Sequence, residues 1–151
     1  LDSSKLTSVQ QTDIQKIISL TASEALFKNS LSILLEVLYT YHGVKPIVII
    51  DEYDIPIIQG YIYGYANEVI MFMRNFYSAG LKGNDYLKQA FITGIINVNE
   101  NSIYSGFNNP EINTILDEQY SQYFGFTSDE VKEMLKYYEV EDKYQEICKC
   151  I

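Results

Sequence analysis

The stretch that decides the fold is Val44-Lys45-Pro46-Ile47-Val48-Ile49-Ile50-Asp51-Glu52-Tyr53-Asp54. Its centre is an unbroken β-branched run from Ile47 to Ile50, with Pro46 before it and two acids directly after it. Such a run is typical of a short strand that is buried on both faces, as in a parallel sheet covered by helices. In open α/β sheets, ligands bind at the carboxyl ends of the strands. Asp51 and Glu52 therefore stand where a binding site is expected.

Four apolar residues followed by Asp-Glu also have the form of a Walker B strand, the acidic strand of P-loop ATPases. In this interpretation Asp51 helps to hold Mg²⁺, usually through water, and Glu52 orients and polarises the attacking water. The alternative is an apolar strand that runs into an acidic turn, since so short a pattern also recurs without this function.

Composition limits the classes of function. The 151 residues are enough for one domain, or a piece of one, with its own core. The net charge of −9 argues against binding of nucleic acids or anionic membranes by this segment. With no long apolar run and no signal-peptide pattern, we expect a cytoplasmic protein without membrane contact. Cys148, Cys150 and the single histidine, His42, form no metal-binding or disulfide pattern.

Helical signals precede the central strand. Residues 1–7 suggest the tail of a strand followed by a turn, and Thr12 or Asp13 is the expected cap of a short helix. Between residues 23 and 41, apolar residues recur with the 3.6-residue period of one helix, which Gly43 is expected to end. A helix followed by a strand is half of a βαβ alternation.

The elements after the central strand repeat this alternation. Pro56 and Gly60 predict a loop, and a second helix is expected over about residues 65–81. A short apolar strand follows at Ala90–Ile92 and ends at Thr93. If the two strands are parallel neighbours, Thr93 lies near Asp51 and Glu52, where P-loop ATPases place a polar residue that senses the γ-phosphate. The alternative is a hydroxyl that only completes a turn.

The C-terminal third is polar and acidic. Residues 97–110 form an Asn-rich stretch that predicts a loop, and Ile112–Leu116 suggests a third strand that ends in Asp117-Glu118. Thr127 and Glu130 have the spacing of a capping box, so a helix is expected to begin there.

Four segments together resemble one family. They are I-V-I-I-D-E-Y-D-I-P (47–56), F-I-T-G-I-I (91–96), N-S-I-Y-S-G-F-N-N (101–109) and I-L-D-E-Q-Y-S-Q-Y-F-G-F-T-S-D-E-V (115–131). In this order and spacing, over about residues 24–138, they closely resemble the AAA-ATPase-like family. In these microbial proteins a nuclease-like domain of the PD-(D/E)XK type often follows the ATPase domain.

The resemblance implies an α/β fold: a partial P-loop NTPase of three αβα layers, with a mainly parallel sheet and a C-terminal helical segment. Residues 1–126 correspond to the partial ATPase domain, and residues 127–151 to the start of a lid-like helical segment. The implied cofactors are ATP and Mg²⁺. Asp51 is the implied metal residue and Glu52 the catalytic one, while Thr93 and Asn97 are the implied residues on the nucleotide side.

This sequence departs from the family pattern in three ways. It contains no G-x-x-x-x-G-K-[ST] phosphate loop, which the resemblance places upstream of Leu1. Asn97 stands where the family commonly has arginine, and the one arginine, Arg74, falls within a predicted helix. We expect no nuclease-like domain within these 151 residues. The expected partners are therefore a P-loop segment, a nuclease-like domain and other copies of the chain, and we expect the isolated chain to bind MgATP weakly.

Three functional interpretations follow. In the first, the chain is the Walker B and sensor part of an ATPase. In the second, it is a degenerate, non-catalytic interaction module with the same fold, which Mg²⁺-dependent nucleotide binding distinguishes from the first. In the third, Asp51, Glu52 and Asp54 form the carboxylate cluster of an unrelated Mg²⁺-dependent phosphohydrolase, which would hydrolyse small phosphate esters by itself.

Overall fold

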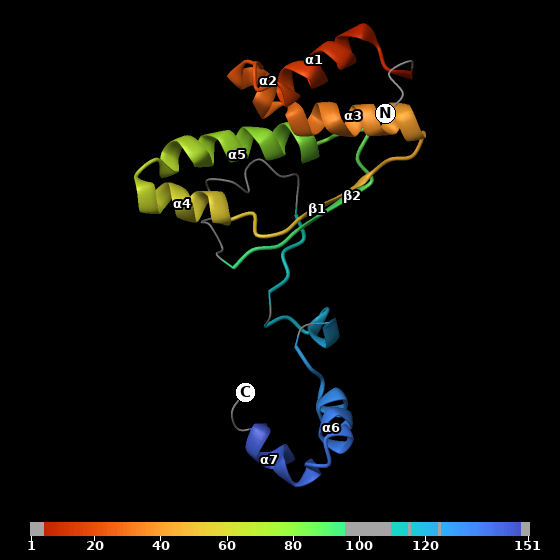
Figure 1. The fold of residues 1–151 in the computed structure, drawn as a ribbon, viewed down its shortest axis with the longest axis vertical. Helices are drawn as coiled ribbons and strands as arrows, with labels where there is room; N and C mark the ends of the chain where they lie inside the picture. Colours follow the sequence, from red (N-terminus) through yellow and green to blue (C-terminus); the bar gives the residue numbers. More distant parts are fainter. Residues whose placement is uncertain (1–4, 96–109, 115, 124, 149–151) are drawn as a thin grey trace. The chain divides into compact units, whose positions relative to one another are not determined.

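The computed structural model describes residues 5–95, 110–114, 116–123 and 125–148 (Figure 1). Contacts divide the chain into two compact units, Leu1–Pro110 and Glu111–Ile151. The division after residue 126, which the family pattern suggests, stays a prediction. None of the helices in the described ranges is long and apolar enough to cross a membrane.

The sheet of the N-terminal unit consists of β1 (Ile47–Ile50) and β2 (Gln89–Ile92). Both strands lie where the sequence predicted them, and they are parallel neighbours, with Ile49 opposite Phe91. The described residues thus form an α/β structure with mostly helices and one small two-stranded sheet. The wider sheet and the three layers of a P-loop NTPase stay predictions.

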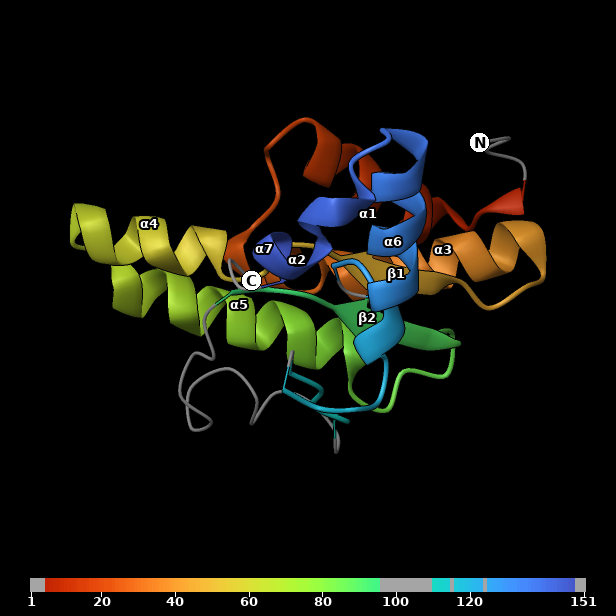
Figure 2. The same ribbon diagram turned by 90° about the horizontal axis from the view of Figure 1, so that it is seen from below.

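Helix α5 is the centre of the helical part of this unit. The helices are α1 (Ser8–Ile18), α2 (Glu24–Lys28), α3 (Ser30–His42), α4 (Ile55–Tyr63) and α5 (Ala66–Leu81). Helix α5 contacts α2, α3 and α4, and Figure 2 shows α4 and α5 side by side. A core cluster of Tyr53, Ile57 and Tyr77 lies where α4 and α5 meet the sheet, and Ile50 and Ile92 pack against it. The helix predicted over residues 65–81 is therefore confirmed.

One expectation for the sheet is wrong, because β1 is not buried on both faces. Val48 and Ile50 are half-buried on the side of the helices, while Ile47 and Ile49 are 49% and 75% exposed. Phe91 of β2 is 49% exposed. Since side chains of a strand alternate between its two faces, these three apolar residues lie on the same, uncovered face. No described element of the N-terminal unit covers it.

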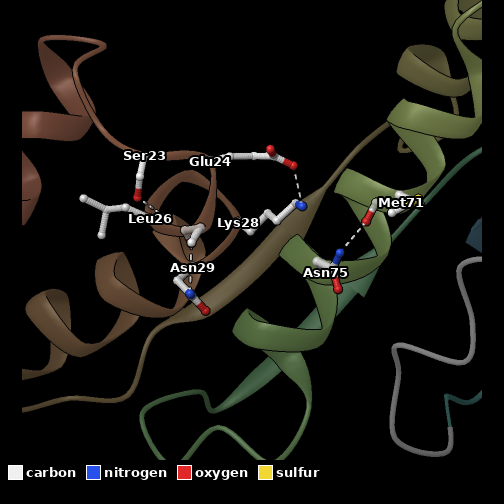
Figure 3. A network of polar contacts seen from close by, with 8 residues as sticks. Ser23, Glu24, Leu26, Lys28, Asn29, Met71 and Asn75 are labelled. Carbon is white, nitrogen blue, oxygen red and sulfur yellow. Dashed lines mark hydrogen bonds and ion pairs between the residues drawn. The ribbon is translucent and has the colours of Figure 1, made fainter.

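The predicted helix over residues 23–41 is two helices. Ser23 caps α2 with its hydroxyl, and Asn29 separates α2 from α3 (Figure 3). The Asn29 side chain donates to the Ala25 carbonyl (2.9 Å), a local bond of the kind that competes with a regular helix. Gly43, with a φ of 69°, ends α3 in the left-handed conformation as predicted.

The first helix begins earlier than expected. Thr7 is its cap: the Thr7 hydroxyl accepts from Gln10 N–H (3.2 Å), and the Gln10 side chain accepts from Thr7 N–H (2.9 Å). Thr12 is not a cap but lies inside α1, where its hydroxyl donates to the Ser8 carbonyl (2.8 Å). Of residues 1–7, only residues 5–7 are described, and they form no strand.

The loop predicted around Pro56 and Gly60 is the helix α4. Pro56 lies in its first turn, where a helix needs no N–H donor, so proline does not oppose it. Gly60 is buried inside the helix, and a Cβ there would lie 2.8 Å from the backbone Cα of Ala66. The glycine thus permits the close approach of α4 to the start of α5 rather than ending the helix.

The C-terminal unit contains the 3-10 helices η3 (Ser121–Tyr123) and η4 (Glu141–Lys143) and the helices α6 (Ser128–Tyr137) and α7 (Tyr144–Ile147). Its capping box is confirmed: Thr127 N–H donates to the Glu130 carboxylate (2.7 Å), and Glu130 N–H donates to the Thr127 hydroxyl (3.3 Å). The Thr127 N–H and the Thr127 hydroxyl both donate to the Glu130 carboxylate and lower its pKa.

The third strand, predicted at 112–116, does not form in the described residues of that segment, which exclude Ile115. Instead, the Asp117 carboxylate accepts from both the backbone N–H (2.6 Å) and the hydroxyl (2.8 Å) of Thr114. These hydrogen bonds turn the chain and lower the pKa of Asp117. Leu116 is 90% exposed, so no core draws this segment into a sheet.

Candidate functional site

The candidate site lies where β1 and β2 end side by side. Beyond the strands, Thr93 N–H donates to the Ile50 carbonyl (2.9 Å), and Tyr53 N–H donates to the Thr93 carbonyl (3.0 Å). These two bonds extend the strand register by one residue and place Thr93 opposite Asp51. The Thr93 hydroxyl donates to the Asp51 carboxylate. The conditional prediction that parallel strands bring Thr93 to Asp51 is thus confirmed, while the roles of both residues are a separate question.

Asp51 and Thr93 continue the alternation of the strands. Asp51 follows Ile47 and Ile49 at intervals of two residues, and Thr93 follows Phe91 in the same way. The carboxylate and the hydroxyl are exposed, and they stand at the end of the uncovered apolar face. A ligand that binds them thus approaches from the side of the sheet opposite to the core cluster.

Glu52 is exposed and has a φ of 53°, in the left-handed region that side chains other than glycine rarely adopt. Its backbone turns the chain from β1 toward α4, and its carbonyl accepts from Ile55 N–H (3.1 Å). Backbone strain of this kind is concentrated at functional sites. The turn thus places the exposed Glu52 side chain next in sequence to Asp51.

Asp54 differs from the two acids before it because it is buried, with 1% of its surface exposed. Its carboxylate accepts from Ile95 N–H (2.9 Å), so it joins the turn after β1 to the turn after β2. Among the described residues, no three His, Cys, Asp or Glu side chains are grouped so as to hold a metal ion. The interpretation of Asp51, Glu52 and Asp54 as one carboxylate cluster is therefore wrong.

Two buried tyrosines belong to the core cluster next to the turns. Tyr53 and Tyr77 are 6% and 1% exposed, and both belong to the core cluster under the ends of the strands. Burial, with a smaller contribution from the neighbouring Tyr53 phenol, raises the pKa of Tyr77 to about 12. The Tyr77 phenol thus stays neutral at physiological pH.

The exposed oxygens fit a magnesium ion that is shared with a nucleotide. Magnesium takes oxygen ligands, keeps several waters and is usually bound through one or two carboxylates and the phosphates of the substrate. Asp51 provides an exposed carboxylate beside the Thr93 hydroxyl, and Glu52 adds a second exposed carboxylate next in sequence. This donor set is too small for a metal site made by protein alone and is sufficient for a phosphate-bound ion.

Other predicted features lie elsewhere. Asn97 is outside the described residues. Arg74 is exposed within α5, as the sequence indicated. An open hollow of about 670 Å³ is lined by residues that precede the strands, including Lys45 and Tyr86, and so lies at the end of the sheet away from Asp51. The acids are thus located by strand topology and not by a large pocket.

Comparison with known proteins identifies the family of this chain. A family model with the description "Predicted AAA-ATPase" matches residues 3–104, which include β1, β2 and the turns after them. The chain belongs to the AAA-ATPase-like family. It is also 30% identical over 90 residues to a protein of Azotobacter chroococcum mcd 1, described as "Uncharacterized protein in vnfD 5'region". The match covers 59% of this chain and 17% of that protein. No solved structure matches the chain significantly.

The bond that Asp54 makes to Ile95 could not be predicted from the sequence. The sequence places Asp54 only in the carboxylate cluster, although Asp directly before an Ile-Pro helix start is a typical capping position. This signal is hidden because Pro56 and Gly60 predict a loop where α4 begins. The contact to Ile95 leaves no pattern in the sequence.

Proposed function

We propose that this chain carries the Walker B and sensor strands of an ATPase, with Asp51, Glu52 and Thr93 acting on a magnesium-bound nucleotide. The observation that carries the proposal is the hydrogen bond from Thr93 to Asp51 at the ends of two parallel strands. The match of a predicted ATPase family over these residues supports it. Open α/β sheets bind their ligands at this edge.

Each residue has a separate task in this proposal. Asp51 holds the magnesium ion, directly or through water, and the Thr93 hydroxyl orients the Asp51 carboxylate. When bound, the ion neutralises charge on the phosphates and makes the terminal phosphorus easier to attack. Glu52 accepts a hydrogen bond from the attacking water and turns its lone pair toward the phosphate. Asn97 completes the set as a residue on the nucleotide side.

The chain lacks one component of this chemistry. No G-x-x-x-x-G-K-[ST] sequence occurs in its 151 residues, so it provides neither the phosphate cradle nor the cradle's lysine. Without a cation, carboxylates repel a nucleoside triphosphate because both carry negative charge. We therefore expect that the isolated chain binds the divalent cation better than it binds MgATP.

Paramagnetic NMR with Mn²⁺ as the probe tests the metal site in the isolated chain. Low Mn²⁺ concentrations should broaden the amide signals of Asp51 and Thr93 before those of α3, and excess Mg²⁺ should reverse this. Asp51→Asn should remove the selective broadening, whereas Glu68→Gln, which makes the same charge change at an exposed site of α5, should keep it. Equal broadening in wild type and Asp51→Asn would contradict the metal assignment.

The catalytic role of Glu52 requires the complete product of the gene. There Glu52→Gln should abolish ATP hydrolysis and preserve MgATP binding, because the amide keeps the shape of the side chain and loses its basicity. Full hydrolysis by that variant would show that the Walker B assignment is wrong.

The second candidate is a non-catalytic interaction module with the same fold. The uncovered apolar face of Ile47, Ile49 and Phe91 favours it. If the complete gene product binds no nucleotide in the presence of Mg²⁺, this interpretation replaces the first.

A further inference from the structure

Asp54 occupies the N-cap position of α4 but does not cap the helix. Aspartate at an N-cap usually accepts from the backbone N–H of the second or third helical residue. Here the side chain makes no such bond, and its carboxylate accepts from Ile95 N–H instead (2.9 Å). The residue thus gives up a common local interaction for one that reaches 41 positions along the chain.

The burial of the Asp54 carboxylate costs free energy unless other groups replace its water. A carboxylate that is 1% exposed has lost its hydration and needs strong partners. A charge-assisted bond from Ile95 N–H is one of them. The N-terminus of α4 adds its positive dipole, since Asp54 directly precedes the first residue of that helix. The buried carboxylate therefore has a backbone N–H donor and a helix N-terminus beside it.

The turn after β2 fits tightly against the same residue. A Cβ at Gly94 would lie 2.9 Å from an Asp54 carboxylate oxygen and 2.5 Å from the ring of Tyr53. Tyr53 N–H donates to the Thr93 carbonyl (3.0 Å). Tyr53 and Asp54 thus both lie close to Gly94, Asp54 also binds Ile95 N–H, and Thr93 is the residue directly before them.

We propose that Asp54 is a positioning residue that holds the turn after β2 so that the Thr93 hydroxyl reaches the Asp51 carboxylate. The role of that contact in metal and nucleotide binding rests on the function proposed above. Asp54 itself touches neither ligand: it acts through Ile95 and Gly94 on Thr93. Asp54, the residue directly before α4, therefore sets the conformation of the turn after β2.

The test compares Asp54→Ala and Asp54→Asn in the 151-residue chain. Native-state hydrogen exchange of the Ile95 amide reports the bond directly. Asp54→Ala should accelerate it about 10–100-fold, because the bond to a charged acceptor is lost. Asp54→Asn keeps an acceptor oxygen in the same place and should cause a smaller acceleration. The amide shifts of Thr93 and Gly94 should change in the same order, Ala more than Asn.

A control separates positioning from a general loss of stability. Val37→Ala deletes two methyl groups from a core residue of α3 that lies outside the Tyr53 cluster, so it weakens the same unit elsewhere. It should leave the Thr93 and Gly94 shifts unchanged. Mn²⁺ broadening of the Asp51 and Thr93 amides should weaken in Asp54→Ala and recover in Asp54→Asn. In Val37→Ala the broadening should stay as in wild type.

The outcomes distinguish this inference from the proposed function. Unchanged Ile95 exchange and Thr93 shifts in Asp54→Ala would refute the positioning role, whatever the metal data show. If Asp54→Ala does not fold, the Ile95 amide of Asp54→Asn is measured instead, where the weaker bond to a neutral acceptor should still accelerate exchange. An Ile95 exchange rate in Asp54→Asn no faster than that in wild type would then refute the positioning role. Conversely, absent Mn²⁺ broadening in the wild type, with Ile95 exchange dependent on Asp54, would refute the metal site and leave the positioning of Thr93 standing.

Discussion

Gly94→Ala is the sharpest test of how the two turns are fitted together. The new Cβ would lie 2.5 Å and 2.6 Å from ring carbons of Tyr53 and 2.9 Å from an Asp54 oxygen. Ordinary contacts are at least about 3.4 Å, so the turn and the ring must separate by about 1 Å. The Tyr53 ring is buried in the core cluster and has little space to move.

The expected loss follows from this overlap. Gly94 is exposed but the Tyr53 ring is buried, and overpacking against a buried side chain typically costs about 1–3 kcal/mol. With a urea dependence of about 1–3 kcal/mol per molar, the unfolding midpoint should fall by about 1 M. Because the displaced turn carries Thr93, a shift of this size also separates its hydroxyl from Asp51 and should weaken Mn²⁺ binding there. Urea denaturation and the amide shifts of Thr93 measure the two effects.

The matched control is Gly80→Ala. Gly80 of α5 is buried against Leu31 of α3, and a Cβ there would overlap the Leu31 side chain. It should lower the midpoint by a similar amount, through the α3–α5 contact, and leave the Thr93 signals in place. The reasoning is refuted if Gly94→Ala is as stable as wild type, or if Gly80→Ala disturbs Thr93 equally.

Three further predictions concern the turn, the uncovered face and the core. Glu52→Gly should be about 1 kcal/mol more stable to urea than Glu52→Ala, because only glycine relieves the left-handed backbone; equal stability would mean that residue 52 is not strained. Ile49→Thr should reduce self-association in analytical ultracentrifugation, since it removes the most exposed apolar residue of the uncovered face, and it should keep the strand; an unchanged sedimentation profile would exclude this face. Because the pKa of Tyr77 is raised to about 12 from 10.0, its contribution to stability is complete below pH 10 and is lost as the pH rises toward 12. Wild type should therefore lose about 2 kcal/mol more than Tyr77→Phe between pH 9 and pH 12 in denaturant titrations, and parallel curves would contradict the assignment.

The elements with strong local signals were predictable. The β-branched run Ile47–Ile50 and the apolar segment before Thr93 have side chains that favour extended backbone, and they form strands by pairing with each other. The Thr127–Glu130 capping box and the Gly43 helix end also depend on neighbouring residues alone. The Asp51–Thr93 contact followed from one added assumption, that the two strands are parallel neighbours.

The errors occurred where the tertiary environment decides between two local possibilities. Pro56 and Gly60 suit a loop as well as a helix start with a close packing contact, and the proximity of Ala66 to Gly60 decides for the helix. Ile112 and Thr114 have the composition of a strand but no neighbouring strand with which to pair in the described residues. A strand needs a partner, and the sequence does not state where the partner is.

The sequence by itself determined the family, the two strands and the identity of the acids at their ends, because these features depend on residue types at short spacing. Only the tertiary structure decided that one face of the sheet is uncovered and that Asp54, next to two exposed acids, is buried and bonded to Ile95. The physical reason is that burial and long-range hydrogen bonds depend on which surfaces meet in space. Asp51 and Thr93 stand 42 residues apart, and no local pattern records the ladder that brings them together.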